Sequence, residues 1–204
     1  MTNPAAVMAL APVIPVIVID DPAQARPLAE ALVAGGLRAL EVTLRTPAAL
    51  EAIGEMAKVE GAMVGAGTVL NEAQLAGAIG AGARFIVSPG LTEPLAKAAI
   101  AADVPFLPGV ATASDIMRGL DLGLDHFKYF PAEANGGIAA LKALAGPFHQ
   151  ARFCPTGGIN AKSAPDWLAL PEVLCVGGSW MVPRGPFDAA AVGTAARQAA
   201  TLAG

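Results

Sequence analysis

Eight short runs of β-branched and other apolar residues alternate along this chain with Ala- and Leu-rich stretches that have a helical period. The expected strands are residues 13–19, 39–44, 62–69, 85–88, 105–109, 126–130, 152–155 and 173–177. The expected helices are residues 22–34, 47–58, 72–79, 93–102, 113–120, 138–144, 164–168 and 187–202. Strands that alternate with helices in this way predict an α/β fold with a parallel sheet.

The number of strand–helix units favours a closed barrel. Eight units in 204 residues have an average spacing of 204/8, or about 25.5 residues, which fits a (β/α)8 TIM barrel near its lower size limit of about 200 residues. The rival architecture, an open doubly wound sheet, would need a Gly-rich first turn. The first turn here, Ile19-Asp20-Asp21-Pro22, has no glycine. Because no linker or charge block divides the chain, we expect a single (β/α)8 domain over residues 1–204.

The composition excludes several classes of protein. With 54% apolar and 15% charged residues and a net charge of −4, the chain is neither disordered nor a nucleic-acid-binding protein with a basic surface. So few charges predict surfaces covered by sister subunits, that is, a homo-oligomer.

The most apolar segment, residues 7–19, is interrupted by two prolines and is shorter than the roughly 20 residues of a membrane-spanning helix. No basic residue precedes Arg26, which argues against a signal peptide, so we expect a cytoplasmic protein without a membrane partner.

Metal sites and several kinds of nucleophile have little support in the sequence. The two histidines, His126 and His149, are far apart in the chain, and no metal-ligand spacing such as Cys-x-x-Cys or Glu-x-x-His occurs. The nucleophile motif Gly-x-Ser-x-Gly is absent as well. Cys154 and Cys175 each lie in an apolar run, which favours buried free thiols over a disulfide or a metal site. We therefore expect no metal and no cofactor.

The second expected strand carries polar residues on one face. In a barrel, the chemistry takes place at the carboxyl ends of the strands. Period-two alternation places Glu41, Thr43 and Arg45 opposite an apolar face. If the apolar face meets the helices, Glu41 and Arg45 point into the barrel and its mouth, where a partly desolvated carboxylate suits proton transfer. The alternative is a structural ion pair between Glu41 and Arg45.

The sixth expected strand contains the most informative residue. Alternation directs Phe127 and Tyr129 outward to the helices and Lys128 inward. Burial disfavours the charged ammonium form, so this amine is a candidate nucleophile for imine chemistry. The alternative is a buried ion pair that supports the barrel, with Glu41 as the candidate partner. The other four lysines lie on helical stretches or after a loop and are expected to be solvated.

Glycine pairs follow the last two expected strands. Thr156-Gly157-Gly158 comes after the seventh, and Gly177-Gly178-Ser179 comes after the eighth. Barrels bind phosphate at these two loops through backbone amides and hydroxyls, although a single Gly-Gly is usually only a turn. Thr68, in Gly65-Ala66-Gly67-Thr68 at the end of the third strand, adds a hydroxyl donor; the alternative is a close backbone approach with a core threonine.

Six stretches together resemble the family of 2-keto-3-deoxy-6-phosphogluconate (KDPG) and 4-hydroxy-2-oxoglutarate (KHG) aldolases, class I enzymes. They lie between about Pro15 and Pro183 and contain Leu-Glu41-Val-Thr-Leu-Arg45-Thr, Val-Gly-Ala-Gly-Thr68-Val-Leu-Asn, Ser88-Pro-Gly-Leu-Thr-Glu-Pro, Phe-Lys128-Tyr-Phe-Pro-Ala-Glu-Ala-Asn-Gly-Gly, Phe-Cys-Pro-Thr156-Gly-Gly and Gly-Gly-Ser179-Trp.

This resemblance implies that Lys128 forms a Schiff base and that Glu41 moves protons in the cleavage of KDPG to pyruvate and glyceraldehyde 3-phosphate in the Entner–Doudoroff pathway. It also implies activity on 4-hydroxy-2-oxoglutarate and a homotrimer. Arg45 and Thr68 would hold the pyruvyl carboxylate. The other substrate-binding residues that it implies are Pro89, Phe130, Thr156, Gly157, Gly158, Gly178 and Ser179.

Two features depart from the family pattern. Some relatives have an arginine near the end of the first strand, where this chain has Val18, so amides and Ser179 would hold the phosphate. The segment before Pro15 is short, which predicts a reduced cap over the bottom of the barrel. Two other functions stay open: an aldolase for the galactonate epimer of KDPG, and a sugar-phosphate-binding barrel in which Lys128 is a passive counter-ion.

Overall fold

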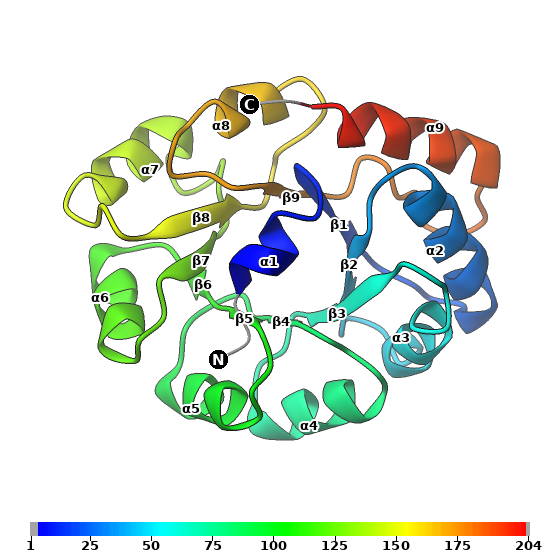
Figure 1. The fold of residues 1–204 in the computed structure, drawn as a ribbon, viewed down its shortest axis with the longest axis horizontal. Helices are drawn as coiled ribbons and strands as arrows, with labels where there is room; N and C mark the ends of the chain where they lie inside the picture. Colours follow the sequence, from blue (N-terminus) through cyan, green and yellow to red (C-terminus); the bar gives the residue numbers. More distant parts are fainter. Residues whose placement is uncertain (1–3, 203–204) are drawn as a thin grey trace.

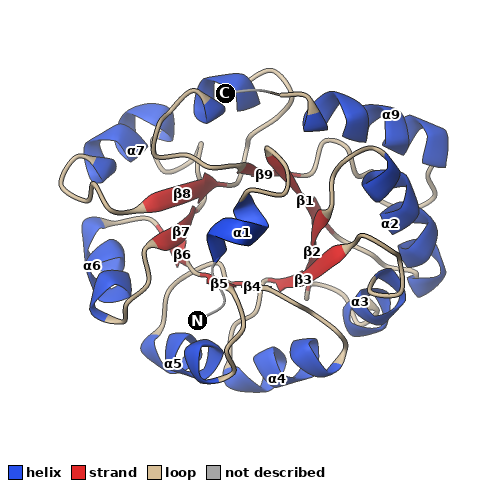
Figure 2. Ribbon diagram, viewed as in Figure 1, coloured by secondary structure: helices blue, strands red, loops and turns tan. Residues whose placement is uncertain are grey.

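The structure of this protein is a computed structural model that describes residues 4–202, so both ends of the expected domain 1–204 lie outside the described residues. The strands form two parallel sheets, with the orders β5-β4-β3-β2-β1-β9 and β6-β7-β8. Figure 2 shows that the strands follow one another around α1. The strands are β1 Val13–Ile17, β2 Ala39–Thr43, β3 Met63–Gly67, β4 Ile86–Val87, β5 Phe106–Leu107, β6 Gly109–Val110, β7 His126–Tyr129, β8 Arg152–Pro155 and β9 Val176–Gly178.

The helices form an outer layer around the strands, except for α1, which lies in the middle of the view in Figure 1. Side-chain caps fix the starts of several helices: Asn71 accepts from Gln74 at α4, and Thr112 forms a capping box with Asp115 at α6. The helices are α1 Pro4–Met8, η1 Pro22–Gln24 (a 3-10 turn), α2 Ala25–Ala34, α3 Ala49–Met56, α4 Glu72–Gly80, α5 Glu93–Ala101, α6 Ala113–Asp121, α7 Gly137–Ala145, α8 Ala164–Leu168 and α9 Ala189–Ala200.

The fold is an α/β fold with a curled parallel sheet, and its strands differ from the expected continuous eight-stranded barrel in two places. The expected strand 105–109 is divided into β5 and β6 at Pro108, whose nitrogen carries no hydrogen for a ladder bond. Between β8 and β9 there are isolated bridges, Phe153 with Val173 and Thr156 with Gly177. The strand order otherwise follows the expected succession of units.

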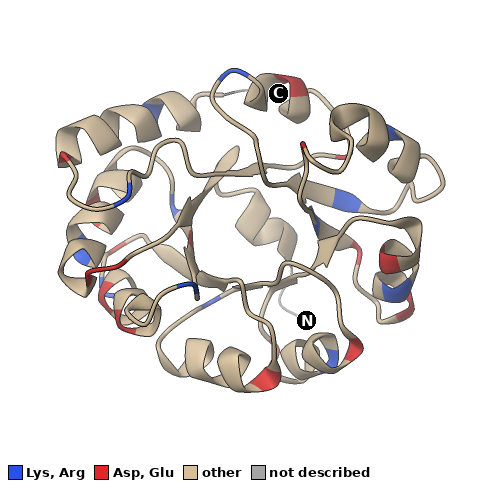
Figure 3. Cartoon of the chain, turned by 180° about the vertical axis from the view of Figure 1, so that it is seen from behind, with Lys and Arg blue, Asp and Glu red and all other residues tan. Residues whose placement is uncertain are grey.

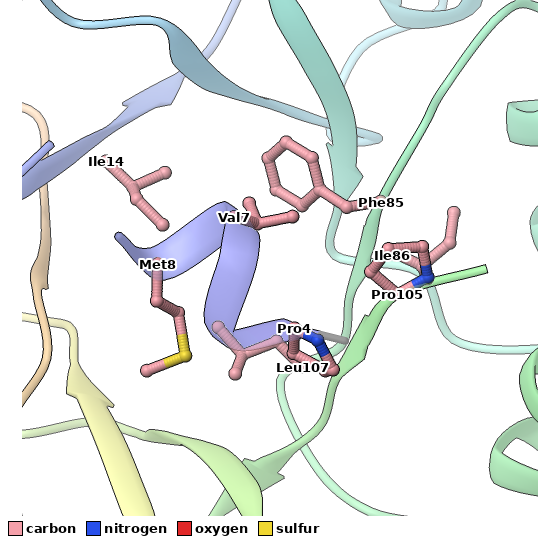
Figure 4. A pocket seen from close by; sticks show the side chains of 8 residues that line it. All are labelled: Pro4, Val7, Met8, Ile14, Phe85, Ile86, Pro105 and Leu107. Atoms are coloured by element: carbon pink, nitrogen blue, oxygen red, sulfur yellow. The ribbon is translucent and has the colours of Figure 1, made fainter. Parts of the chain in front are cut away.

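The segment before Pro15, from which the sequence predicted a reduced cap, contains the short helix α1. Its Val7 and Met8 are buried with Ile14 and Phe85, which lie where strands begin. Figure 4 shows these side chains around a small apolar pocket, lined by Pro4, Val7, Met8, Ile14, Phe85, Ile86, Pro105 and Leu107. Apolar side chains therefore cover the end at which the strands begin, and a polar site has to lie where they end.

Charged residues are rare on the strands. Figure 3 shows Lys, Arg, Asp and Glu mainly on the outer helices and the loops. In the strands of residues 4–202, these residue types occur at Glu41, Lys128 and Arg152 alone. Arg152 stands at the start of β8 and donates to the carbonyls of His149 and Ala151. Glu41 and Lys128 are thus the charged groups to explain in the middle of the strands. No helix in the described part of the chain has the length and apolarity to cross a membrane.

Candidate active site

Lys128 and Glu41 meet on the inner side of the curled parallel sheet. Phe127 and Tyr129 belong to the apolar core shared with the helices, whereas Lys128, between them, points inward, as the alternation predicts. Its Nζ donates to Oε1 of Glu41 over 3.0 Å. The two side chains are only 5% and 4% exposed. This is a desolvated ammonium–carboxylate pair. It is the ion pair that the sequence offered as the alternative for Lys128, and it shows that Glu41 pairs with Lys128 and not with Arg45.

Two neighbours shape the surroundings of this pair. A Cβ added at Gly67 would lie 2.2 Å from Oε1 of Glu41, so only a glycine at this position leaves room for the carboxylate. On the other side, Nζ of Lys128 lies 5.3 Å from the centroid of the Phe130 ring, a distance at which a cation is attracted to an aromatic face. The half-buried Phe130 therefore borders the amine.

Arg45 and Thr68 are brought together at the carboxyl ends of β2 and β3. Nε of Arg45 donates to Oγ1 of Thr68 over 3.2 Å. Arg45 is exposed and Thr68 half-buried, so the guanidinium faces the mouth of the site and keeps donors for a ligand. Thr68 adopts a left-handed backbone conformation with φ of 59°. A guanidinium beside a hydroxyl group suits a planar carboxylate.

The two glycine loops lie side by side, because Thr156 forms a parallel bridge with Gly177. Gly157 and Gly158 have φ of 106° and 83°, in the left-handed region that favours glycine. Within residues 4–202, the backbone amides of Gly157, Gly158 and Ser179 donate no hydrogen bond. Three free amides on adjoining loops are suited to an anion.

The remaining expected site residues line these loops in different ways. Gly178 is covered by an indole ring, since a Cβ added there would lie 1.8 Å from Cζ3 of Trp180. Thr156 is buried, and its hydroxyl donates to the carbonyl of Cys154 over 3.3 Å. Pro89 is half-buried after β4, and a Cβ at Gly109 would lie 2.1 Å from its carbonyl oxygen. These three positions are fixed by close packing.

Gly67, Glu133 and Trp167 are not singled out by the sequence as site residues. Glycine inside a strand pattern signals that another part of the chain approaches the backbone closely. The Gly65-Ala66-Gly67 stretch therefore indicated a close contact at Gly67, but it did not indicate that Glu41 makes this contact. Nε1 of Trp167 donates to Oε1 of Glu133 over 2.9 Å, across 34 residues. Because no local pattern marks such a contact, only the fold reveals it.

Both cysteines are free and buried, as predicted. A hydrogen bond with Cys154, followed by burial, raises the pKa of the Cys175 thiol well above its usual range, so this thiol is not an activated nucleophile. Among residues 4–202, no group of three or more His, Cys, Asp and Glu side chains is arranged to hold a metal ion. Lys128 is therefore the candidate nucleophile that the geometry offers.

Comparison with known proteins identifies the family. A profile of the KDPG and KHG aldolases matches residues 5–194. The 2-dehydro-3-deoxy-phosphogluconate aldolase of Zymomonas mobilis is 61% identical over 96% of this chain and 94% of its own. The KHG/KDPG aldolase of Escherichia coli K12 is 57% identical over 92% of this chain and 89% of its own. A crystal structure of KDPG aldolase from Legionella pneumophila, with pyruvate captured as a covalent carbinolamine, has a TM-score of 0.93 and 47% identity over 98% of this chain and 99% of its own. The chain belongs to the KDPG and KHG aldolase family.

Proposed function

We propose that this protein is a class I aldolase that cleaves KDPG to pyruvate and D-glyceraldehyde 3-phosphate, in the Entner–Doudoroff pathway. The observation that carries the proposal is the buried Lys128–Glu41 pair, with 3.0 Å between Nζ and Oε1. A second activity, cleavage of 4-hydroxy-2-oxoglutarate to pyruvate and glyoxylate, is supported by the names of the family and of the Escherichia coli relative. Covalent capture of pyruvate by the Legionella relative supports imine chemistry here.

The pair supplies both the nucleophile and the proton carrier for the first half of the reaction. When Glu41 takes a proton from Nζ, Lys128 becomes a neutral amine that attacks the C2 ketone of the substrate and forms a carbinolamine. Glu41 then returns the proton to the C2 hydroxyl group, which leaves as water. The product is a protonated imine between Lys128 and the substrate.

The protonated imine is an electron sink for breaking the C3–C4 bond. Glu41 takes the proton of the C4 hydroxyl group, the C3–C4 bond breaks, and the aldehyde leaves while the bonding electrons form an enamine on C3. Protonation of C3 by Glu41 regenerates an imine, and water releases pyruvate and the free amine. Each positioned proton transfer contributes about 10²- to 10⁴-fold in rate.

We further propose that the ends of the substrate bind at two separate places. The pyruvyl carboxylate would bind to Arg45 and Thr68, which already contact each other at 3.2 Å. The phosphate would bind to the free amides of Gly157, Gly158 and Ser179. Val18, half-buried after β1, supplies no cation there. Pro89, Phe130, Thr156 and Gly178 would shape the walls between the two ends.

We also propose a closed barrel, a homotrimeric assembly and a cellular location for this protein. The bridges between β8 and β9 and the parallel pairing of all other neighbours around α1 support a single closed (β/α)8 barrel domain, despite the break at Pro108. The sparse charge of the chain supports a homo-oligomer. From the family resemblance we propose that it is a homotrimer, which light scattering after gel filtration would test. We also propose a cytoplasmic location, for which two free buried cysteines are suited and which cell fractionation would test.

The decisive experiment is reduction of the protein with borohydride in the presence of pyruvate, followed by digestion and mass spectrometry. We expect one reduced adduct, on the peptide that contains Lys128. Lys142, on α7, serves as an internal control because its side chain is exposed. An active sample without an adduct, or with its adduct on another lysine, would refute the proposed mechanism.

A further inference from the structure

Glu133 lies against the Gly157–Gly158 turn that we propose as part of the phosphate site. Its backbone amide donates to the carbonyl of Gly157 over 3.0 Å. A Cβ added at Gly158 would lie 2.7 Å from both Cβ and Cγ of Glu133. The stem of the Glu133 side chain therefore packs directly on the backbone of Gly158, with no space for another atom between them.

The carboxylate of Glu133 is in turn held by the core. Trp167, on α8, is fully buried, and its Nε1 donates to Oε1 of Glu133 over 2.9 Å. The indole ring also packs on Tyr129 of β7, with 6.2 Å between ring centroids. A buried indole N–H requires an acceptor, and Glu133 is its acceptor among the described residues. Trp167 is thereby fixed on one side by the core and on the other by Glu133.

These contacts connect the core to a turn with unused amides. Main-chain hydrogen bonds join the loop after β7 to this turn, since the amides of Ala132 and Glu133 donate to the carbonyls of Thr156 and Gly157. The turn itself has two residues at positive φ and gives its own amides to no acceptor in residues 4–202. Its position therefore depends on these two main-chain hydrogen bonds and on the side chains that pack against it, which are Phe130 at Gly157 and Glu133 at Gly158.

We propose that the Trp167–Glu133 hydrogen bond is a positioning device that holds the Gly157–Gly158 turn ready for the substrate's phosphate group and so sets the preference for phosphorylated substrates. This inference rests on the proposed function. Glu133 and Trp167 are positioning residues, since both act through the turn. Lys128 and Glu41 belong to other contacts, so imine formation does not depend on this device.

The two substrates of the proposed aldolase provide the test. KDPG carries a phosphate, and 4-hydroxy-2-oxoglutarate does not, although both require Lys128 and Glu41. We expect Glu133→Ala and Trp167→Phe to raise the KM for KDPG about tenfold, the factor that corresponds to losing one hydrogen bond to a charged group. The kcat/KM for 4-hydroxy-2-oxoglutarate should stay within about twofold of the wild type, because a substrate without a phosphate loses no binding free energy when the turn moves.

Two control variants distinguish loss of the Trp167–Glu133 hydrogen bond from loss of the Glu133 charge and from a folding defect. Glu133→Gln keeps an acceptor for Trp167 and the packing on Gly158, so it should retain a KM for KDPG within about threefold of the wild type. Asp166→Ala removes an exposed carboxylate from the neighbouring position on α8 and should change neither substrate's kinetics. Thermal unfolding of every variant reports folding independently of activity.

The outcomes distinguish this inference from the proposed function. Borohydride trapping of pyruvate on Lys128 does not need the phosphate site, so it should be unchanged in Glu133→Ala. An unchanged KM for KDPG in Glu133→Ala and Trp167→Phe would overturn the positioning role. So would parallel losses with both substrates, because these would indicate a general structural role. Failure of trapping in the wild type would instead overturn the proposed function.

Discussion

Nζ of Lys128 lies 3.0 Å from Oε1 of Glu41, although 87 residues separate the two in sequence and both side chains are almost completely buried. Bringing a charged pair out of water has a large desolvation cost, and such a pair rarely adds net stability. In a chain with few charged residues, a buried pair at the centre of the strands is better explained by chemistry than by stability.

Replacement of Glu41 by Gln should greatly reduce turnover and leave binding in place. Gln occupies nearly the same volume but can neither take nor return a proton, so kcat for KDPG should fall by about 10²- to 10⁴-fold. Steady-state kinetics with KDPG, together with pyruvate binding measured by calorimetry, checks this. Turnover within a few-fold of the wild type would contradict the assignment of Glu41 as the proton carrier.

A methyl group at position 67 should disturb catalysis without replacing a titrating residue. The added Cβ in Gly67→Ala would meet Oε1 of Glu41 at 2.2 Å, so the carboxylate has to move away from Lys128. Since a displacement of about 1 Å can cost about 10² in rate, we expect kcat to fall by about tenfold to a hundredfold. Gly80→Ala is the matched control, because a Cβ there meets nothing within 4 Å. Equal kinetics in the two variants would argue against the steric role of Gly67.

Arg45 should matter equally for both substrates, unlike Glu133. If its guanidinium binds the pyruvyl carboxylate, Arg45→Ala removes charge-assisted hydrogen bonds worth about 1.5–3 kcal/mol, and the KM for KDPG and for 4-hydroxy-2-oxoglutarate should both rise by about 10- to 100-fold. Arg118→Ala, which alters an exposed pair with Asp115 on α6, is the control. A rise with KDPG alone would place Arg45 at the phosphate instead.

The inward direction of Lys128 could be predicted from sequence, because alternation within a strand is a local property. Phe127 and Tyr129 are apolar neighbours that belong against the helices, and this fixes the side on which Lys128 lies. The alternation of strands and helices could be predicted for the same reason, because each element is indicated by its own stretch of sequence. The Glu41–Lys128 contact could be named as a candidate only, since the register between distant strands decides it.

Other features depend at least partly on tertiary contacts. The division of the fifth strand at Pro108 follows from a missing donor together with the close approach of Gly109 to Pro89. The hydrogen bond from Trp167 to Glu133 joins a core side chain to a loop. The helix α1 owes its burial to side chains at the starts of several strands, which the sequence of the helix itself does not show.

Removal of Lys128 should show the energetic cost of its buried partner. In Lys128→Met, Glu41 loses its cation while buried, and leaving an uncompensated buried charge costs about 3–5 kcal/mol. The double variant Lys128→Met, Glu41→Gln removes that charge and should regain most of the loss. Urea denaturation at neutral pH compares the two free energies of unfolding. If the single and double variants were equally unstable, the charge pair would not be the cause.

The cysteines should be unreactive in the folded protein and should affect stability at alkaline pH. The hydrogen bond with Cys154, and then burial, raise the pKa of Cys175 in the folded state, and the unfolded value is about 8.5. Between these two values the folded state binds more protons than the unfolded state, so the free energy of unfolding falls as the pH rises above about 8.5. Because both cysteines are buried, we expect a thiol reagent at pH 8 to label neither before denaturation and both afterwards. Urea unfolding between pH 8 and 10 should have a shallower pH dependence in Cys175→Ala than in the wild type, and identical slopes would contradict the assignment.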